Sequence, residues 1–578
     1  MIKNKLFFKF ARYLLPYWKS ELLILILSSL TVLFALVNPY FGKLIMDKAI
    51  IGKDLKNFVI FFSASALVFV VSGVVKAAAD YLERVVKFKV TVELTRDLFV
   101  CFEKLSINWF QGKSTGEHVY KITYDSERIA ELITAVPRKI ITILGGILFT
   151  CLVLFYLDWR ITLLSWFIML VMGVSQYYFN RKLKNIGEDI IKNTEFLFKK
   201  LTELFSHIKL VKAFGSDGAE IKKYLHNWLI NMHLQLKNSK LDILAVFAGN
   251  AISKVVIGGI VFYGGYQVIR GRLTLGTLTV VIVYLSQLFG LVENFASFWR
   301  VAIRGFISCG RVEQLISEEA KVVESAQAQE ILMDEGRIVV ENLSFGYKSI
   351  PVLEKLSFVI EPGSCVAIAG RSGSGKTTLL NLLLRLYDPW QGGISIDGHN
   401  IKEFKFISLR SQIGIAMQEP FLWEDSIFNN IKYPLERVSN DQVVWAARMT
   451  GADQFINNLP NKYSTIIGEN GCKLSEGQKQ KIAIARALIK NPKILILDEA
   501  MSSMDSESEE QIIKNIRQAY SKTTFIIVSH RLSAIHAADL VYFIKNPYSI
   551  VIAKSEQIMR NEKELYDLFA PQIKLTKS

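Results

Sequence analysis

Cysteine is scarce in this chain, with five residues scattered over 578 positions. The number is odd and no Cys-x-x-Cys spacing occurs, so the sequence predicts neither a disulfide framework nor a zinc site. We therefore interpret all five as reduced packing residues. They are Cys101, Cys151, Cys309, Cys365 and Cys472.

Acidic residues are also in short supply, since 53 Asp and Glu stand against 69 Lys and Arg, and the formal net charge is +16. Such an excess is typical of proteins that bind nucleic acid and of membrane proteins with basic loops beside anionic lipid. The chain has no basic stripe with interleaved aromatic residues, which argues against a nucleic-acid partner. The charge therefore favours membrane lipid as the neighbouring surface.

A signal-peptide cleavage site is missing as well. Residues 1–20 are basic and aromatic, but no small-residue site follows, and the next apolar run is too long for a signal peptide. We expect an interfacial amphipathic helix in this segment. No peptidase domain precedes the first apolar run, so leader-peptide cleavage by this chain is not expected.

Long hydrophobic runs are what the sequence has in abundance. Hydrophobic residues make up 51% of the chain, and the mean hydropathy is +0.28. Six runs are long enough to cross a bilayer as helices. They predict an α-helical transmembrane domain over residues 21–305, with spans near 22–41, 58–79, 140–157, 161–179, 243–269 and 278–299.

A glycine-rich motif in the C-terminal half reads G-x-x-x-x-G-K-[ST] and runs Gly370-Arg371-Ser372-Gly373-Ser374-Gly375-Lys376-Thr377. An apolar run precedes it and a helical run follows, which is the strand–loop–helix context of a phosphate-binding loop. Backbone N–H groups and the helix N-terminus would bind phosphates. Lys376 would reach the β- and γ-phosphates of a nucleotide, and Thr377 would bind Mg²⁺.

A second apolar strand, 494–497, ends in two carboxylates, Asp498 and Glu499. We expect Asp498 to orient Mg²⁺ and Glu499 to polarise an attacking water. Strand-like and helix-like segments alternate through this region, which predicts an α/β P-loop ATPase domain with a mostly parallel sheet. The strand candidates are 337–341, 364–369, 413–417, 494–497 and 524–528.

The segment before this strand resembles the L-S-G-G-Q signature of the ATP-binding-cassette (ABC) family, and it stands here as Leu474-Ser475-Glu476-Gly477-Gln478. Further landmarks follow the family's order. They match the aromatic residue that stacks on adenine, the Q-loop glutamine, the D-loop aspartate and the switch histidine, and they are Tyr347, Gln418, Asp505 and His530. The loop 468–471 is similar to the segment that precedes the signature in exporters.

The resemblance implies the roles of the site residues. The catalytic residues would be Glu499, His530 and Gln418, and the Mg²⁺ ligands would be Thr377, Gln418 and Asp498. ATP would be bound by Tyr347, Gly370, Ser372, Gly373, Ser374, Gly375, Lys376, Thr377 and Thr378 of one chain and by Ser475, Gly477, Gln478 and Asp505 of a second.

Six spans ahead of one such domain resemble an exporter-type half-transporter, with a linker at 306–336 and the cassette at 337–578. The resemblance implies a multi-pass cell-membrane protein that dimerises, closes on ATP and expels its substrate by alternating access. The substrate would be a peptide, a lipid or an amphipathic small molecule. Two alternatives stay open: one half of a heterodimer with an asymmetric ATP site, or an ATP-gated regulator that moves no substrate.

The resemblance extends to the long loops 80–139 and 180–242. The stretch with Gly116, Glu117 and Asp125 is similar to the family's first intracellular loop, and residues 208–216 are similar to its second coupling region. Both long loops and the N-terminus would share the cytosol with the cassette, because an even number of spans separates each loop from it. Their many Lys and Arg agree with the positive-inside rule.

The chain departs from the family pattern at Glu476, which replaces the first glycine of the signature. A carboxylate there would either face the partner's γ-phosphate, as in one half of a heterodimer, or point away and stabilise the helix N-terminus. The tail after residue 540 also lacks the family's glycine turn. Within the spans, Lys254 and Glu293 lie at similar depth and would either pair with each other or line the substrate path.

Overall fold

The structure is a computed structural model that describes residues 2–111, 115–318, 322–468 and 471–555, together with Gln557, Glu562 and Phe569. The chain forms two compact units, Met1–Glu319 and Ala320–Ser578. The described part of the first unit is helical, and the second carries the paired strands of two sheets. The expected order, a helical domain followed by an α/β domain, is confirmed.

The helices of the first unit are α1 (Ile2–Ala11), α2 (Trp18–Leu44), α3 (Leu55–Lys104), α4 (Ile107–Gln111), α5 (Thr115–Tyr120), α6 (Ser126–Lys139), α7 (Gly146–Leu157), α8 (Trp159–Ser206), α9 (Ile208–Ala213), α10 (Asp217–Ile269) and α11 (Leu275–Ile316). Within the described residues, six helical stretches are long and apolar enough to cross a membrane. The expected six spans are therefore confirmed. The long loops of the sequence are mostly continuations of α3, α8 and α10.

Side chains in the short links fix where the long helices begin. Asp54 and Asp158 each accept a hydrogen bond from the backbone N–H two residues further on, at 3.0 and 2.8 Å. Thr274 accepts one from the N–H three residues further on, at 3.1 Å. These caps satisfy N–H groups that have no partner within the helix. The starts of α3, α8 and α11 are therefore set by local sequence.

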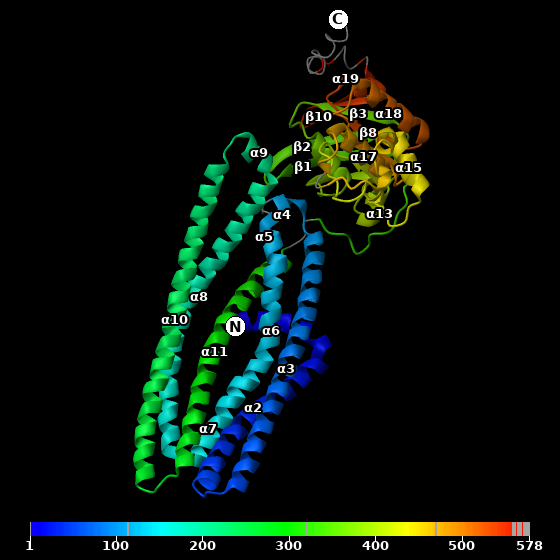
Figure 1. Cartoon of the computed structure of the whole chain (residues 1–578). Helices are drawn as coiled ribbons and strands as arrows, with labels where there is room; N and C mark the ends of the chain where they lie inside the picture. The colour runs from blue at the N-terminus through cyan, green and yellow to red at the C-terminus, as the bar shows by residue number, and fades with distance from the viewer. Residues whose placement is uncertain are drawn as a thin grey trace. The chain divides into compact units, whose positions relative to one another are not determined.

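The first unit packs around α11. Figure 1 shows α8 and α10 side by side, with α11 between this pair and the helices α2, α3 and α6. One apolar core includes Leu94 on α3, Ile133 on α6 and Val312 on α11, and another includes Met172 on α8 and Leu288 on α11. All five of these side chains are buried.

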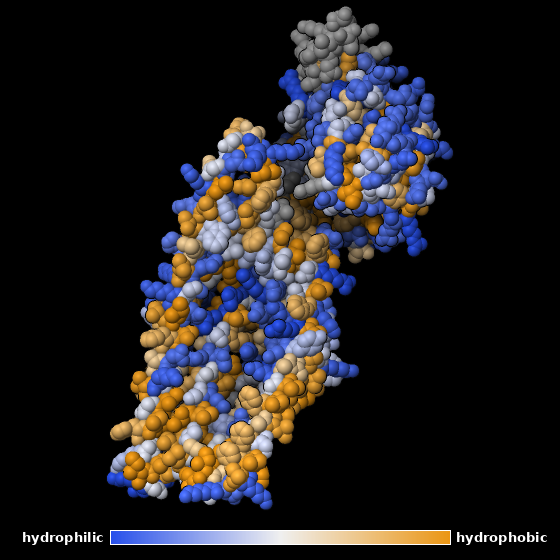
Figure 2. Space-filling view, viewed as in Figure 1, coloured by the Kyte–Doolittle hydropathy of each residue, from blue (hydrophilic) through white to orange (hydrophobic). Residues whose placement is uncertain are grey.

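Large apolar side chains also cover the outside of this unit. Phe62, Leu170 and Phe262 are 59%, 68% and 82% exposed. Figure 2 shows such residues gathered over the end of the unit where the short links join the helices, with hydrophilic residues at the tip. A surface of this kind is unfavourable in water and suits contact with lipid tails.

The second unit contains two sheets. A four-stranded sheet has the order β2-β1-β4-β5, and a six-stranded sheet has the order β10-β9-β3-β8-β7-β6. In the larger sheet, β9, β3, β8, β7 and β6 run parallel to their neighbours, and β10 pairs antiparallel with β9. The strands are β1 (Ile338–Tyr347), β2 (Ile350–Ile360), β3 (Cys365–Gly370), β4 (Gln391–Ile396), β5 (His399–Asn400), β6 (Ile413–Ala416), β7 (Ile494–Asp498), β8 (Thr524–Val528), β9 (Leu540–Asn546) and β10 (Ser549–Ala553).

Helices connect these strands and cover the larger sheet. They are α12 (Lys376–Leu383), α13 (Phe406–Ser411), α14 (Ile427–Lys432), α15 (Asn440–Met449), α16 (Ala452–Asn457), α17 (Glu476–Leu488), α18 (Ser506–Ala519) and α19 (Leu532–Ala537). The mostly parallel sheet agrees with the alternation read from the sequence. The tail without a glycine turn still forms the β9–β10 hairpin, because Asn546 Oδ1 accepts a hydrogen bond from the backbone N of Tyr548 at 3.1 Å.

Candidate functional site

Four neighbouring parallel strands end at one edge of the larger sheet. The strand β3 leads into the glycine-rich loop, β8 into His530, β7 into Glu499 and β6 into Gln418. Register places Asp498 opposite Val528, and Val528 opposite Ile368. Because carboxyl ends of parallel strands meet at the same edge, the fold gathers segments that lie more than 100 residues apart in sequence.

The glycine-rich loop has the backbone that its sequence requires. Gly373 and Gly375 have φ of 82° and 99°, a left-handed region that residues with a side chain rarely adopt. A Cβ on Gly375 would also lie 2.7 Å from Leu353 Cδ2. The ammonium of Lys376, at the start of α12, donates to the carbonyl oxygens of Gly370 at 2.8 Å and of Arg371 at 3.0 Å.

The glycine-rich loop has side-chain hydroxyl groups that are available to bind a triphosphate. The hydroxyl of Ser374 is buried without a hydrogen-bond partner, and the side chains of Ser372 and Thr377 are exposed. Orphaned donors, a lysine and the N-terminus of α12 together match the negative oxygens of phosphates. The donor set therefore suits the phosphates of ATP with Mg²⁺ on Thr377.

Charges couple across this edge of the sheet. Burial lowers the pKa of Lys376, and the nearby Glu499 and Asp498 carboxylates act in the opposite direction. Burial also raises the pKa of Asp498, with a further increase from Glu499 and a decrease from Lys376. The partly buried Asp498 carboxylate is an oxygen ligand of the kind that Mg²⁺ prefers.

Glu499 is held in an unusual conformation. Its φ is 48°, which is uncommon for a residue with a side chain and is often found at functional sites. Its backbone N donates to the carbonyl oxygen of Val528 at 2.8 Å. This geometry brings its Oε1 to 3.2 Å from His530 Nε2. The structure thus joins the expected base and the switch histidine in one pair.

Tyr347 stands beside the same loop. Its hydroxyl lies 3.3 Å from the hydroxyl of Thr378, which is buried in the first turn of α12. The Tyr347 ring makes edge-to-face contacts with Phe345 and Tyr387, with centroids 5.3 and 5.5 Å apart. These contacts fix the ring next to the phosphate loop, where it could stack on a base. Gln418 follows β6 and is exposed.

The signature segment forms the start of α17. Ser475 caps the helix by accepting from the N of Gln478 at 3.3 Å, while Gln478 Oε1 accepts from the N of Ser475 at 3.0 Å. Glu476 lies in the first turn, 63% exposed, with its Oε1 2.8 Å from Lys479 Nζ. Its charge is therefore balanced on its own helix.

The signature does not complete the phosphate loop within one chain. Between described residues 475–478 and 370–378, the structure forms no hydrogen bond and no ion pair. Of the expected loop 468–471, Glu469 and Asn470 lie outside the described residues.

A link between α17 and the D-loop, residues 502–505, was not predicted from the sequence. Gln480 is buried, its Nε2 donates to Ser502 Oγ at 3.1 Å, and its Oε1 accepts from the N of Ser503 at 3.0 Å. A Cβ on Gly477 would lie 3.2 Å from the Ser503 oxygen. Only its position two residues after the signature could have drawn attention to Gln480.

The residue after the switch histidine holds the other side of the D-loop. Arg531 donates to the carbonyl oxygens of Met504 at 2.5 Å and Ser502 at 2.9 Å, and it pairs with the buried Glu509 at 3.2 Å. At the end of this loop, Asp505 caps α18 by accepting from the N of Ser508 at 2.8 Å, a bond that lowers the pKa of Asp505.

The charged residues within the spans do not form the pair that the sequence suggested. Lys254 is exposed, and the described residues show no ion pair between it and Glu293. Glu293 faces α8 and α10 instead: a Cβ on Gly249 would lie 3.1 Å from its Oε1 and 3.3 Å from Gln176 Nε2. Similar depth in the membrane did not predict the pairing, because Lys254 lies on the exposed surface whereas Glu293 lies against α8 and α10.

The segments likened to intracellular loops are short helices of the first unit. Gly116 lies in α5, where a Cβ would be 3.0 Å from Thr202 Oγ1 of α8, so the two helices approach closely. Glu117 pairs with Lys121 at 2.7 Å. The stretch 208–216 contains α9, which joins α8 to α10 (Figure 1).

Known proteins resemble this chain over most of its length. A family model described as ABC transporter transmembrane region matches residues 22–292, and one described as ABC transporter matches residues 353–502. An ATP-dependent lipid A-core flippase from Syntrophus aciditrophicus is 33% identical over 520 residues, which are 88% of this chain and 85% of the relative. A putative multidrug export ATP-binding/permease protein from Staphylococcus aureus is 32% identical over 495 residues, or 85% and 86% of the two chains.

The fold has a close counterpart among solved structures. The structure of a bacterial Atm1-family ABC exporter with ATP bound has a TM-score of 0.87 and 27% sequence identity, and the match covers 97% of this chain and 99% of that one. The spans, the cassette and these similarities agree with the motifs read from the sequence. The chain belongs to the ABC transporter family, as an exporter-type half-transporter whose membrane domain is fused to an ATPase cassette.

Proposed function

We propose that two copies of this chain form an exporter that moves an amphipathic substrate out of the cytosol by alternating access. The observation that supports a dimer is the separation of the signature from the phosphate-binding loop. Residues 475–478 make no hydrogen bond or ion pair with the described phosphate-binding loop of their own chain. A second chain would supply its signature to each phosphate loop. ATP would then add contacts only in the closed pair and shift the population toward it.

Within each site, the residues take distinct roles. Lys376, Ser374 and the loop N–H groups bind the phosphates, and Tyr347 stacks on the base. Glu499 accepts a proton from the attacking water, and His530 holds its carboxylate through the 3.2 Å pair. Thr377, Asp498 and Gln418 would hold Mg²⁺, which neutralises charge on the phosphates when bound.

The same scheme assigns residues 1–20 to an interfacial helix, 21–305 to the membrane domain, 306–336 to a linker and 337–578 to the cassette. The cassette, the N-terminus and the loops 80–139 and 180–242 lie in the cytosol. The loops' Lys and Arg support this orientation, because basic residues favour the cytoplasmic side.

We favour a homodimer. Glu476 is exposed and paired with Lys479 on its own helix, which supports the interpretation that it stabilises the start of α17. An intact Glu499 and His530 pair further supports turnover at both sites. The substrate class is a lipid, a peptide or an amphipathic small molecule, in keeping with relatives named as a lipid A-core flippase and a putative multidrug exporter.

The proposal is tested by ATP turnover of the chain purified alone into lipid vesicles, beside a Glu499→Gln variant. We expect turnover that is lost in the variant, while ATP binding is retained. An unmodified chain that binds ATP and does not hydrolyse it would contradict the homodimer. Uptake of a fluorescent amphipath into inside-out vesicles, driven by ATP, then separates an exporter from a regulator that moves no substrate.

A further inference from the structure

A cavity of about 220 Å³ lies among α6, α8, α10 and α11 and is rich in positive charge. Three arginines line it, Arg128 on α6 and both Arg300 and Arg304 on α11. Asp242 is the carboxylate among the described residues that line it. The side chains of four helices therefore surround a space with more guanidinium than carboxylate charge.

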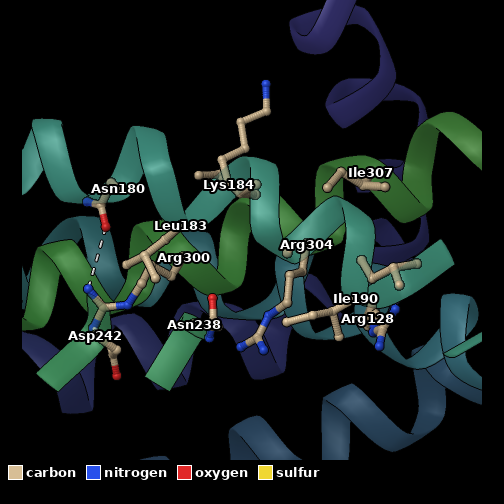
Figure 3. Close-up of a pocket in the computed structure, with 13 residues that line it drawn as sticks. Arg128, Asn180, Leu183, Lys184, Ile190, Asn238, Asp242, Arg300, Arg304 and Ile307 are labelled. Atoms are coloured by element: carbon tan, nitrogen blue, oxygen red, sulfur yellow. Dashed lines mark hydrogen bonds and ion pairs between the residues drawn. The ribbon is translucent and has the colours of Figure 1, made fainter. Parts of the chain in front are cut away.

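The single carboxylate is already engaged. Asp242 Oδ1 lies 3.2 Å from Arg300 Nη2, and Arg300 Nη1 donates to Asn180 Oδ1 at 3.5 Å (Figure 3). In the described residues, the guanidinium groups of Arg128 and Arg304 make no hydrogen bond and no ion pair. The Arg128 guanidinium lies 5.8 Å from the Tyr120 ring centroid, and its Nη1 is buried without a hydrogen-bond partner. A buried guanidinium nitrogen without a partner is costly, and an anion would satisfy it.

The guanidinium group restricts the chemistry of the ligand. Its fork of donors matches the planar carboxylate and the phosphate group, and two such forks can share one phosphate. Figure 3 shows the Lys184 ammonium extending away from Arg300 and Arg304. Lys184 also lies 3.8 Å from Glu188. The anion-binding groups of the cavity are therefore arginines, and Lys184 lines it with its aliphatic stem.

The depth of the cavity suits a headgroup. Arg300 and Arg304 follow the first residue of α11 by 25 and 29 positions, which is about 38 and 44 Å along the helix. The hydrocarbon core of a bilayer is about 30 Å thick. The cavity therefore lies beyond the core, on the side assigned above to the cytosol, where phosphates of inner-leaflet lipids and of soluble compounds are present.

We propose that this cavity binds the phosphate group of the transported substrate before export, with Arg128 and Arg304 as its principal ligands. This inference rests on the proposed export function and narrows its substrate class to phosphate-bearing amphipaths. Arg300 shapes the site by holding Asp242 aside through their ion pair. The asparagine Asn238, which also lines the cavity, supplies an uncharged amide donor.

Binding to the full chain in a neutral detergent tests the site without requiring ATP turnover. The probes are dihexanoyl phosphatidic acid and inorganic phosphate, titrated at constant ionic strength and followed by microscale thermophoresis. We expect phosphatidic acid to bind, and Arg128→Gln and Arg304→Gln each to weaken its binding by about tenfold or more, because each removes a charge-assisted fork. Lys184→Gln, the matched control, should change the affinity by less than about twofold, as an exposed cation that does not touch the ligand.

Inorganic phosphate distinguishes the sources of the anion. Competition by inorganic phosphate would show that the group itself is recognised, whereas binding of phosphatidic acid without competition would show that the lipid anchor is needed. Equal binding by the arginine variants and the unmodified chain would overturn the proposal, as would an effect of Lys184→Gln as large as theirs. Arg304 is exposed, so its substitution leaves the fold intact.

A second readout separates this inference from the proposed function. Phosphatidic acid should stimulate ATP turnover in vesicles of neutral lipid, and the stimulation should be lost in Arg304→Gln. Binding without stimulation in a chain that hydrolyses ATP would overturn the role in substrate capture. A chain that binds the probe through these arginines but never hydrolyses ATP would instead contradict the exporter and leave the anion site standing.

Discussion

Substitution of Arg311 by methionine tests a buried charge contact of the membrane unit. Arg311 on α11 donates to Asp125 Oδ1 at 2.5 Å and to Glu195 Oε2 at 3.0 Å. Asp125 is fully buried and also accepts from Ser308 Oγ at 2.8 Å. Arg311 therefore ties α11 to the segment before α6 and to α8, and methionine keeps most of its length while removing the charge.

The expected cost follows from burial. Breaking a buried ion pair leaves an uncompensated charge and destabilises by about 3–5 kcal/mol. Asp125 would keep the hydrogen bond from Ser308 and the nearby charge of Arg128, so we expect the cost of Arg311→Met to lie near the lower end of this range. A control lies two residues away on the same helix, where Glu313 pairs with Lys9 at 2.8 Å and the two side chains are 30% and 45% exposed. Glu313→Gln should cost about 1 kcal/mol or less.

The measurement is the thermal unfolding midpoint of the full chain in lipid nanodiscs, at one scan rate for all variants. Arg311→Met should lower the midpoint by about 5 °C or more, and Glu313→Gln by about 1 °C. The double variant Asp125→Asn with Arg311→Met should recover part of the loss, because it removes both charges. Equal midpoints for Arg311→Met and Glu313→Gln, or costs that simply add in the double variant, would refute the reasoning.

Four further predictions concern the cassette. Lys376→Met should weaken ATP binding by about tenfold or more, measured by titration with a fluorescent analogue, because the buried ammonium is lost. Gln480→Leu should remove the hydrogen bond that Gln480 Oε1 accepts from the backbone N of Ser503, at a cost of about 0.5–1.5 kcal/mol. We expect kcat to fall in this variant while the unfolding midpoint changes little; an unchanged kcat would show that the link is only structural. Glu476→Gly should alter turnover little, and a rise of about tenfold would instead show that the carboxylate, despite its pair with Lys479, impairs the site. Removal of Mg²⁺ by a chelator should abolish phosphate release from ATP. Release that persists would contradict the assignment of Thr377, Asp498 and Gln418 as Mg²⁺ ligands.

Much of the fold was predictable because it rests on contiguous sequence. The length and hydropathy of each apolar run are local properties, and they determined the six spans. The glycine-rich loop needs left-handed backbone at Gly373 and Gly375, and the sequence supplies glycine there. The helix starts at Asp54 and Asp158 are likewise set by side chains that bond to N–H groups two residues away.

The site required more than the motifs. The sequence named Glu499 and His530 separately, but their 3.2 Å pair depends on β7 and β8 lying next to each other in the sheet. In the sequence, Gln480 and Arg531 showed no feature that predicted a role, apart from their position close to a motif. Their bonds to the D-loop arise because α17 and the segment after β8 both pack against it.

The sequence by itself thus determined the class of the protein: six spans, a phosphate loop, two carboxylates after a strand and a signature segment identify an ATP-driven membrane protein. Tertiary structure alone decided which charges meet. It left Lys254 and Glu293 unpaired with each other, buried Asp125 against Arg311, and placed Arg128 beside arginines more than 170 residues away. The physical reason is that a motif acts through neighbours along the chain, whereas an ion pair or a cavity depends on which faces of distant helices pack together.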